Sequence, residues 1–260
     1  MSVSEILSLS FKLYRSKFLQ FFLPFLISGI ILGVFFYAIT SSFPLPTPPL
    51  IPAYRGAPLP YEELIEWFFA LLWAIIMISI LSGLVSWIVG TTTTGVVIKN
   101  ASDQIEKGTS NLGVSFNFAI SKLPSLLVAQ FVAGILTVIG MLLFIVPGII
   151  IAIMFSLVLP AIIVEQKGAF ESLGRSRRLV SKRWLKTFAL SLVLGIIFLI
   201  VGGIAYVLTM AFNFIHPIIN PLVTNIISAF VAPISLIAVT YLYYAMVARE
   251  IPPPPPPPTL

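Results

Sequence analysis

Six long apolar runs constrain the fold of this chain more than any other feature. A helix needs about 20 apolar residues to cross roughly 30 Å of hydrocarbon. Only 9% of the residues are charged and 58% are hydrophobic, whereas a soluble domain carries about 25% charged residues. The sequence therefore predicts an all-α integral membrane protein of about six transmembrane helices. The six runs are Phe18–Thr40, Trp67–Gly90, Leu123–Val146, Ile149–Val164, Thr187–Phe212 and Leu222–Val247.

Only Pro147 and Gly148 separate the third run from the fourth. The combined stretch is too long for one span, and the dipeptide Pro-Gly is typical of turns. We therefore expect a hairpin of two full spans that folds back at Pro147 and Gly148. Because the fourth run is short, a re-entrant hairpin is the alternative.

The lysines and arginines alternate with the runs. Fourteen of the 15 lie within residues 12–17, 99–122 and 167–186 or at Arg249, and only Arg55 lies in the intervening loops. Loops rich in lysine and arginine stay in the cytoplasm. This distribution predicts an even number of spans in a multi-pass cell membrane protein with both termini cytoplasmic.

Segments outside the runs divide the chain further. Residues 1–17 form an amphipathic pattern, in which Ser2 and Glu5 have the spacing of a capping box. We expect this segment to be an interfacial helix that precedes a six-span domain at residues 18–250.

Two segments are rich in proline. The outer loop at residues 41–62 contains seven prolines, which prevent a regular helix there. The tail at residues 251–260 contains seven consecutive prolines, which favour a polyproline II rod. Such a rod could dock on an aromatic groove of a partner protein, and a solvated tail without a partner is the alternative.

Residues 165–186 are predicted to form a basic cytoplasmic helix. Arg175, Arg178, Lys182 and Lys186 fall on one helical face, opposite the apolar residues. Near an anionic membrane, each such residue contributes about 1 kcal/mol of attraction. The pattern fits an interfacial helix that only follows the charge rule, and the more specific interpretation is a surface that binds anionic lipid head groups. Nucleic acid is not expected as a ligand, because the basic stripe is short and adjoins the membrane.

The same region resembles a known family. Pro147 and Gly148, an apolar span, Pro160, Glu165 and the pair Arg175-Ser176 precede an end rich in lysine and arginine. This order resembles the glycerophosphoryl diester phosphodiesterase membrane-domain family and its stand-alone YciC-like relatives, over about residues 140–190. The resemblance extends more loosely to Phe11–Pro24 and Asp103–Gly108.

The resemblance implies a helical membrane domain that is sometimes fused to a phosphodiesterase. We expect no such activity here, because the chain contains no soluble catalytic domain. The resemblance points to a structural or interaction motif, within which we expect an arginine to hold Glu165 near the membrane surface. The motif consists of Pro147, Gly148, Pro160, Glu165, Arg175 and Ser176.

The remaining residues favour no enzyme chemistry. The chain has no cysteine and a single histidine, His216, and no ionisable residue lies at the centre of any run. We therefore expect no catalytic residue, metal site or cofactor. The function favoured by the sequence is that of a non-enzymatic membrane protein that organises lipids or partner proteins through its basic helix. A permease-like component for an apolar or amphiphilic solute is the alternative.

Overall fold

The computed structural model describes residues 1–49, 61–212 and 219–250. Six helices in these residues are long and apolar enough to cross a membrane, which confirms the predicted all-α membrane fold. The helices are α1 (Val3–Ser16), α2 (Phe18–Ser42), α3 (Tyr61–Lys107), α4 (Leu112–Leu143), α5 (Ile145–Met154), α6 (Val158–Val164), α7 (Ala169–Ser181), α8 (Trp184–Phe212) and α9 (Ile219–Val247).

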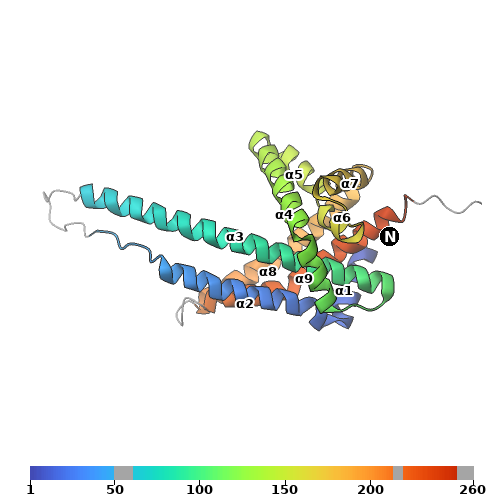
Figure 1. Cartoon of the computed structure of the whole chain (residues 1–260), viewed down its shortest axis with the longest axis horizontal. Helices are drawn as coiled ribbons and strands as arrows, with labels where there is room; N and C mark the ends of the chain where they lie inside the picture. The colour runs from blue at the N-terminus through green and yellow to red at the C-terminus, as the bar shows by residue number, and fades with distance from the viewer. Residues whose placement is uncertain (50–60, 213–218, 251–260) are drawn as a thin grey trace, which may run out of the picture.

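The long helices α2, α3, α8 and α9 run lengthwise together, and the red end of α9 lies close to the N-terminus (Figure 1). The described lysines and arginines gather towards this end, on α1, the last turns of α3, the first third of α4, the α7 region, the first turn of α8 and the residues just after α9. We call it the basic end of the bundle. The N-terminus and the end of α9 both lie there, which agrees with an even number of spans, and the compartment that this end faces stays a prediction.

The N-terminal helix begins as its sequence predicts. The Ser2 hydroxyl accepts a hydrogen bond from the backbone N–H of Glu5, and the Glu5 carboxylate accepts one from the backbone N–H of Ser2. This capping box satisfies two donors at the start of α1. Further along α1, Ile6 is fully buried in a cluster with residues of α7, α8 and α9, so α1 packs on the basic end.

Helix α3 extends well beyond the predicted second run. Lys99 and Lys107 were expected in a loop together with Lys122, but the structure places the first two on α3 and the third on α4. The ammonium groups of Lys99 and Lys107 lie 3.0 and 2.7 Å from Asp103. Because these pairs are four residues apart, they support a helix even where the apolar run has ended.

The predicted hairpin turn at Pro147 and Gly148 is wrong by a few residues. The chain turns at Phe144, whose backbone is extended, and both residues lie in the first turn of α5. A proline fits there because the first N–H groups of a helix have no intrahelical acceptor. Gly148 allows α5 to approach α4, since a Cβ atom on it would lie 2.7 Å from the backbone nitrogen of Met141.

The fourth predicted run is a broken helix. Residues 155–157 interrupt it between α5 and α6, and Pro160 lies in the first turn of α6. Together, Ile145–Val164 is one of the six segments of span length. Figure 1 shows α4 and α5 rising away from the four long helices, and the choice between two full spans and a re-entrant hairpin stays open.

The proline-rich loop is shorter than the predicted range 41–62, because α2 ends at Ser42 and α3 begins at Tyr61. Helix α2 stops there because prolines follow, and a residue that precedes a proline disfavours the helical conformation. The last backbone hydrogen bond of the helix runs from the N–H of Phe43 to the carbonyl of Ile39, just before the first proline. Residues 50–60 of this loop and the predicted polyproline tail at 251–260 lie outside the described residues.

Candidate functional site

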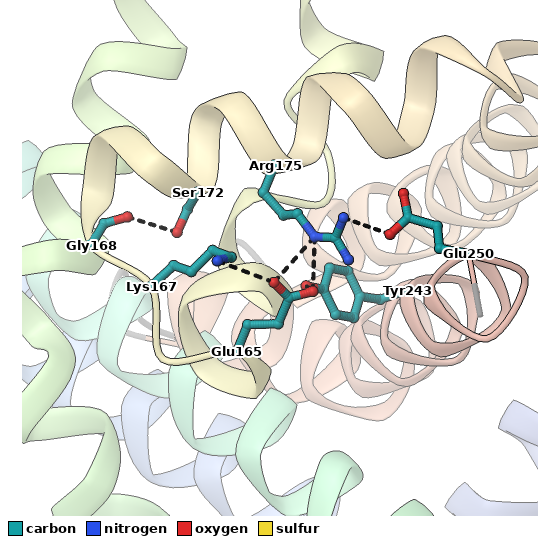
Figure 2. A network of polar contacts seen from close by, with 7 residues as sticks. All are labelled: Glu165, Lys167, Gly168, Ser172, Arg175, Tyr243 and Glu250. Atoms are coloured by element: carbon teal, nitrogen blue, oxygen red, sulfur yellow. Dashed lines mark hydrogen bonds and ion pairs between the residues drawn. The ribbon is translucent and has the colours of Figure 1, made fainter. Parts of the chain in front are cut away.

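The candidate site forms where α6 ends and α7 begins, at the basic end of the bundle. Glu165 is the C-cap of α6 and Gly168 is the N-cap of α7. Between them, Gln166 has a positive φ of 53°, a conformation that few non-glycine residues adopt. This short connection folds α7 back over α6, so that Arg175 on α7 points towards Glu165 (Figure 2).

Arg175 lies between two carboxylates from distant parts of the chain. Its Nε atom lies 2.8 and 3.1 Å from the two carboxylate oxygens of Glu165, and its terminal nitrogen lies 2.6 Å from Glu250. The Tyr243 hydroxyl donates a 2.5 Å hydrogen bond to Glu165, and the Lys167 ammonium lies 3.6 Å from it. We call these five residues the Glu165–Arg175 network, and it ties α7 to α6 and α9.

The network changes the protonation of its central pair. Burial alone would raise the pKa of Glu165, but hydrogen bonds from Tyr243 and Arg175 and the charges of Arg175 and Lys167 lower it below its ordinary value of 4.5. Burial would likewise lower the pKa of Arg175, and its bonds to Glu250 and Glu165 raise it instead. Both groups are therefore charged at neutral pH.

The lowered pKa predicts how stability depends on pH. A carboxyl whose pKa is lower in the folded protein contributes stability above its unfolded value, here 4.5, and loses it as the pH falls through the folded value. Thermal unfolding in detergent between pH 7 and pH 3 should therefore show the contribution of Glu165 vanish below about pH 4.5.

The variant Glu165→Gln isolates this contribution from those of the other carboxylates. We expect it to be less stable than the wild type at pH 7 and to approach wild-type stability at the acidic end, because the wild-type carboxyl is then neutral as well. Equal stability of the two proteins across the whole range would show that this ion pair contributes nothing.

Ser176 closes the break between α5 and α6. Its hydroxyl donates a 2.7 Å hydrogen bond to the carbonyl of Met154 and accepts a 3.1 Å bond from the N–H of Leu157. The side chain is fully buried, and an unpaired backbone group in such a place is costly. One α7 side chain thus satisfies both ends of a broken helix.

Replacing Ser176 by alanine should lower the free energy of unfolding by about 1–2 kcal/mol, because it leaves a buried carbonyl and a buried N–H without partners. The control is Ser181→Ala, in which an exposed hydroxyl on the same helix loses a bond to the carbonyl of Arg178. Thermal unfolding in detergent measures both. Similar melting temperatures for the two variants would contradict the bridging role of Ser176.

The structure brings together most of the predicted motif. Pro160, Glu165, Arg175 and Ser176 all lie around the junction of α5, α6 and α7. The expected contact between Glu165 and an arginine is present. Pro147 and Gly148 lie apart from them, at the opposite end of α5.

The predicted lipid-binding residues separate into three environments. Arg178 and Lys182 are exposed. Arg175 is not on this surface, because the two carboxylates hold its guanidinium and leave the side chain 14% exposed. Lys186 is partly buried and donates a hydrogen bond to the carbonyl of Met1. The predicted helix at 165–186 is also divided, since α7 ends at Ser181 and α8 begins at Trp184.

Sequence reasoning missed Tyr243 and Glu250 as members of the network. Tyr243 lies within an apolar run and carries no pattern that distinguishes it from other buried aromatics. Glu250 offered a weak signal, as an acidic residue among the basic residues that flank the spans. Both are recognisable only once the end of α9 lies near Glu165 and Arg175.

A second polar cluster, on the part of α3 nearest the basic end, was also missed. The buried Asn100 side chain donates to the backbone carbonyl of Gln20 on α2, and Ser102 shares a 2.8 Å hydrogen bond with Tyr244 on α9. These contacts join three helices beneath the basic end. Their signal was the group of polar residues just after the second apolar run.

Comparison with known proteins identifies one family. Its description is a domain of unknown function (DUF7847), and its profile matches residues 66–249, which include α4 to α9 and the whole Glu165–Arg175 network except Glu250. No protein with a curated description and no solved structure matches the chain. The resemblance to the glycerophosphoryl diester phosphodiesterase membrane domain is not confirmed and stays a prediction.

Proposed function

This chain belongs to the family of a domain of unknown function (DUF7847), and we propose that it is a non-enzymatic multi-pass membrane protein. In this proposal, the protein organises anionic lipids at the membrane surface through α7. In this proposal, α7 lies on the cytoplasmic face of the membrane, as the positive-inside rule predicts. A partner protein with an acidic surface is the other ligand that α7 could recruit.

One observation carries the proposal: ion pairs and buried hydrogen bonds hold α7 against its neighbours, while several of its cations have no carboxylate partner. The Glu165–Arg175 network and Ser176 fasten one side of α7 to α6 and α9. The side chains of Arg177, Arg178 and Lys182 are nevertheless exposed. Within the described ranges, no carboxylate lies within the 4.0 Å of an ion pair to any of these three.

Unpaired cations on a fixed helix suit a membrane surface. Each lysine or arginine near anionic lipid contributes about 1 kcal/mol of attraction. A helix that is already ordered loses little conformational entropy when it binds. A shallow groove along α7, lined by Lys167, Glu171, Gly174, Arg177 and Arg178, provides room for head groups.

Lipid titration tests the proposal. The double variant Arg177→Gln/Arg178→Gln should bind phosphatidylglycerol about 30-fold more weakly than the wild type, in a neutral detergent at low salt. The matched control is Lys12→Gln/Arg15→Gln, which removes two charges from α1 and should have a smaller effect. Native mass spectrometry against phosphatidylcholine measures the preference, and unchanged binding in the α7 variant would overturn the proposal.

A groove in the membrane region favours the permease-like alternative. Its volume is about 490 Å³ and it lies between α2, α3 and α4, with Leu23, Ile27, Ile88 and Phe116 among its lining residues. The hydroxyl groups of Thr92 and Thr93 in this lining donate to their own helix, so the groove suits an apolar chain. Faster movement of a labelled lipid between leaflets of reconstituted vesicles would support this alternative.

A further inference from the structure

A hollow of about 280 Å³ lies where the α7–α8 turn meets the end of α9. Lys182 and Arg183 belong to the turn, and Arg249 follows the last residue of α9. Its floor is apolar, since the lining residues Leu179 and Met246 are each only 3% exposed. Cations from two distant parts of the chain thus share one hollow.

The positive charges around the hollow lack counter-charges. Among the described residues, no carboxylate lies within 4.0 Å of Lys182, Arg183 or Arg249. Glu250 also lines the hollow, but its carboxylate is turned towards Arg175, as Figure 2 shows. The carboxylate of Glu250 therefore pairs with Arg175 and not with Lys182, Arg183 or Arg249.

A fourth cation lies close by. Lys186, in the first turn of α8, is near enough to Arg183 and Arg249 for their charges to repel its own, and the charge of Glu5 on α1 offsets part of this repulsion. Its ammonium is held in place by the carbonyl of Met1. Like charges gathered in this way are unfavourable unless an anion lies among them.

The position of the hollow indicates the kind of anion. The apolar span of α8 starts at Trp184, directly after Arg183, and the span of α9 ends at Val247, two residues before Arg249. The hollow therefore lies where the apolar part of the bundle meets the water, the level occupied by phospholipid head groups. A soluble anion could bind anywhere on the surface that faces water, so this position favours a phospholipid.

We infer that this hollow is a discrete site for the phosphate group of one anionic phospholipid. Arg183 and Arg249 are its principal ligands, because a guanidinium matches two phosphate oxygens at once. Lys182 and Lys186 add charge, and the apolar floor formed by Leu179 and Met246 faces the upper part of the lipid. The inference rests on the proposed function and deepens it, since it adds one stoichiometric site to the diffuse attraction of α7.

Native mass spectrometry of the full chain in neutral detergent tests this site with three probes: phosphatidylglycerol, phosphatidylcholine and inorganic phosphate. We expect one phosphatidylglycerol per chain to remain bound at high salt, where the diffuse attraction is screened. The variant Arg183→Gln/Arg249→Gln should bind it about 30-fold more weakly. Inorganic phosphate that binds as tightly as the lipid would overturn the assignment to a phospholipid.

Two further variants separate this site from the surface of α7. Arg177→Gln/Arg178→Gln removes the same charge outside the hollow and should keep the lipid that resists salt. The variant Arg183→Lys/Arg249→Lys keeps the charge and should retain part of the affinity for the lipid. It therefore tests the role of the two guanidinium groups even if the glutamine variant unfolds. If a folded Arg183→Gln/Arg249→Gln protein keeps all of the lipid that resists salt, the proposed phosphate site is wrong. If only the α7 variant loses binding, the proposed function stands and the phosphate site does not.

Discussion

Replacing Arg175 by alanine is expected to lower the free energy of unfolding by about 2–3 kcal/mol. The substitution leaves the carboxylates of Glu165 and Glu250 without the guanidinium that lies between them and pairs with each. Removing one partner of a fully buried ion pair costs about 3–5 kcal/mol. The cost here is smaller, because the carboxylate side chains are 22% and 34% exposed and water can solvate them in part.

The control for this variant is Arg178→Ala on the exposed side of the same helix. We expect a change within about 0.5 kcal/mol, as for most exposed substitutions. Arg175→Lys should recover only part of the loss, because one ammonium cannot reproduce a planar guanidinium that donates to two carboxylates. If heating in detergent unfolds Arg175→Ala and Arg178→Ala at the same temperature, the network does not hold α7 in place.

Replacing Gly148 by alanine should also cost about 2–3 kcal/mol, through overpacking rather than charge. The new Cβ atom would lie 2.2 Å from Cγ of Met141 and 2.7 Å from its backbone nitrogen. The Met141 side chain can rotate away, but its backbone cannot move without separating α4 from α5. We therefore expect a lower melting temperature and faster proteolysis near the turn at Phe144.

Gly134→Ala is the matched control, because Gly134 lies on α4 and a Cβ atom there meets nothing within 4 Å. This change should be neutral or stabilising by up to about 1 kcal/mol, since alanine favours a helix over glycine. A Gly148→Ala protein that melts at or above the temperature of the Gly134→Ala protein would contradict the close contact of α4 and α5.

The number of spans was predictable because the requirement is local. Each helix must present about 20 apolar residues to hydrocarbon whatever its neighbours are, and all six runs became helices of span length. The ends of the helices were less predictable. Loss of hydrophobicity after Gly90 marks the end of an apolar run, but α3 continues to Lys107 because charged residues spaced by four also form a good helix.

The turn at Phe144 shows a second limit of local reasoning. Pro147 and Gly148 have turn propensity, but a proline is equally at home in the first turn of a helix. The choice between these two positions depends on how closely α5 packs against α4. That contact needs a glycine inside the helix, and no pattern in the sequence distinguishes such a glycine from one in a turn.

The site was predictable only in part, for a related reason. Glu165 and Arg175 stand out as opposite charges beside a span, and a contact between them followed from their proximity in the chain. Tyr243 on α9 and Glu250 just after it enter the network from about 75 residues further along. Their part in it depends on which helix packs beside α7.

By itself, the sequence determined that this chain is an all-α membrane protein with six helices of span length, and that the basic residues of its described part lie towards one end. Those properties follow from the energy of moving single side chains between water and hydrocarbon, which depends on residue type alone. Only the tertiary structure decided which cations are paired and which are free. Arg175 and Arg178 look alike in the sequence, but packing of α7 against α6 and α9 brings carboxylates to the first and leaves the second facing outwards.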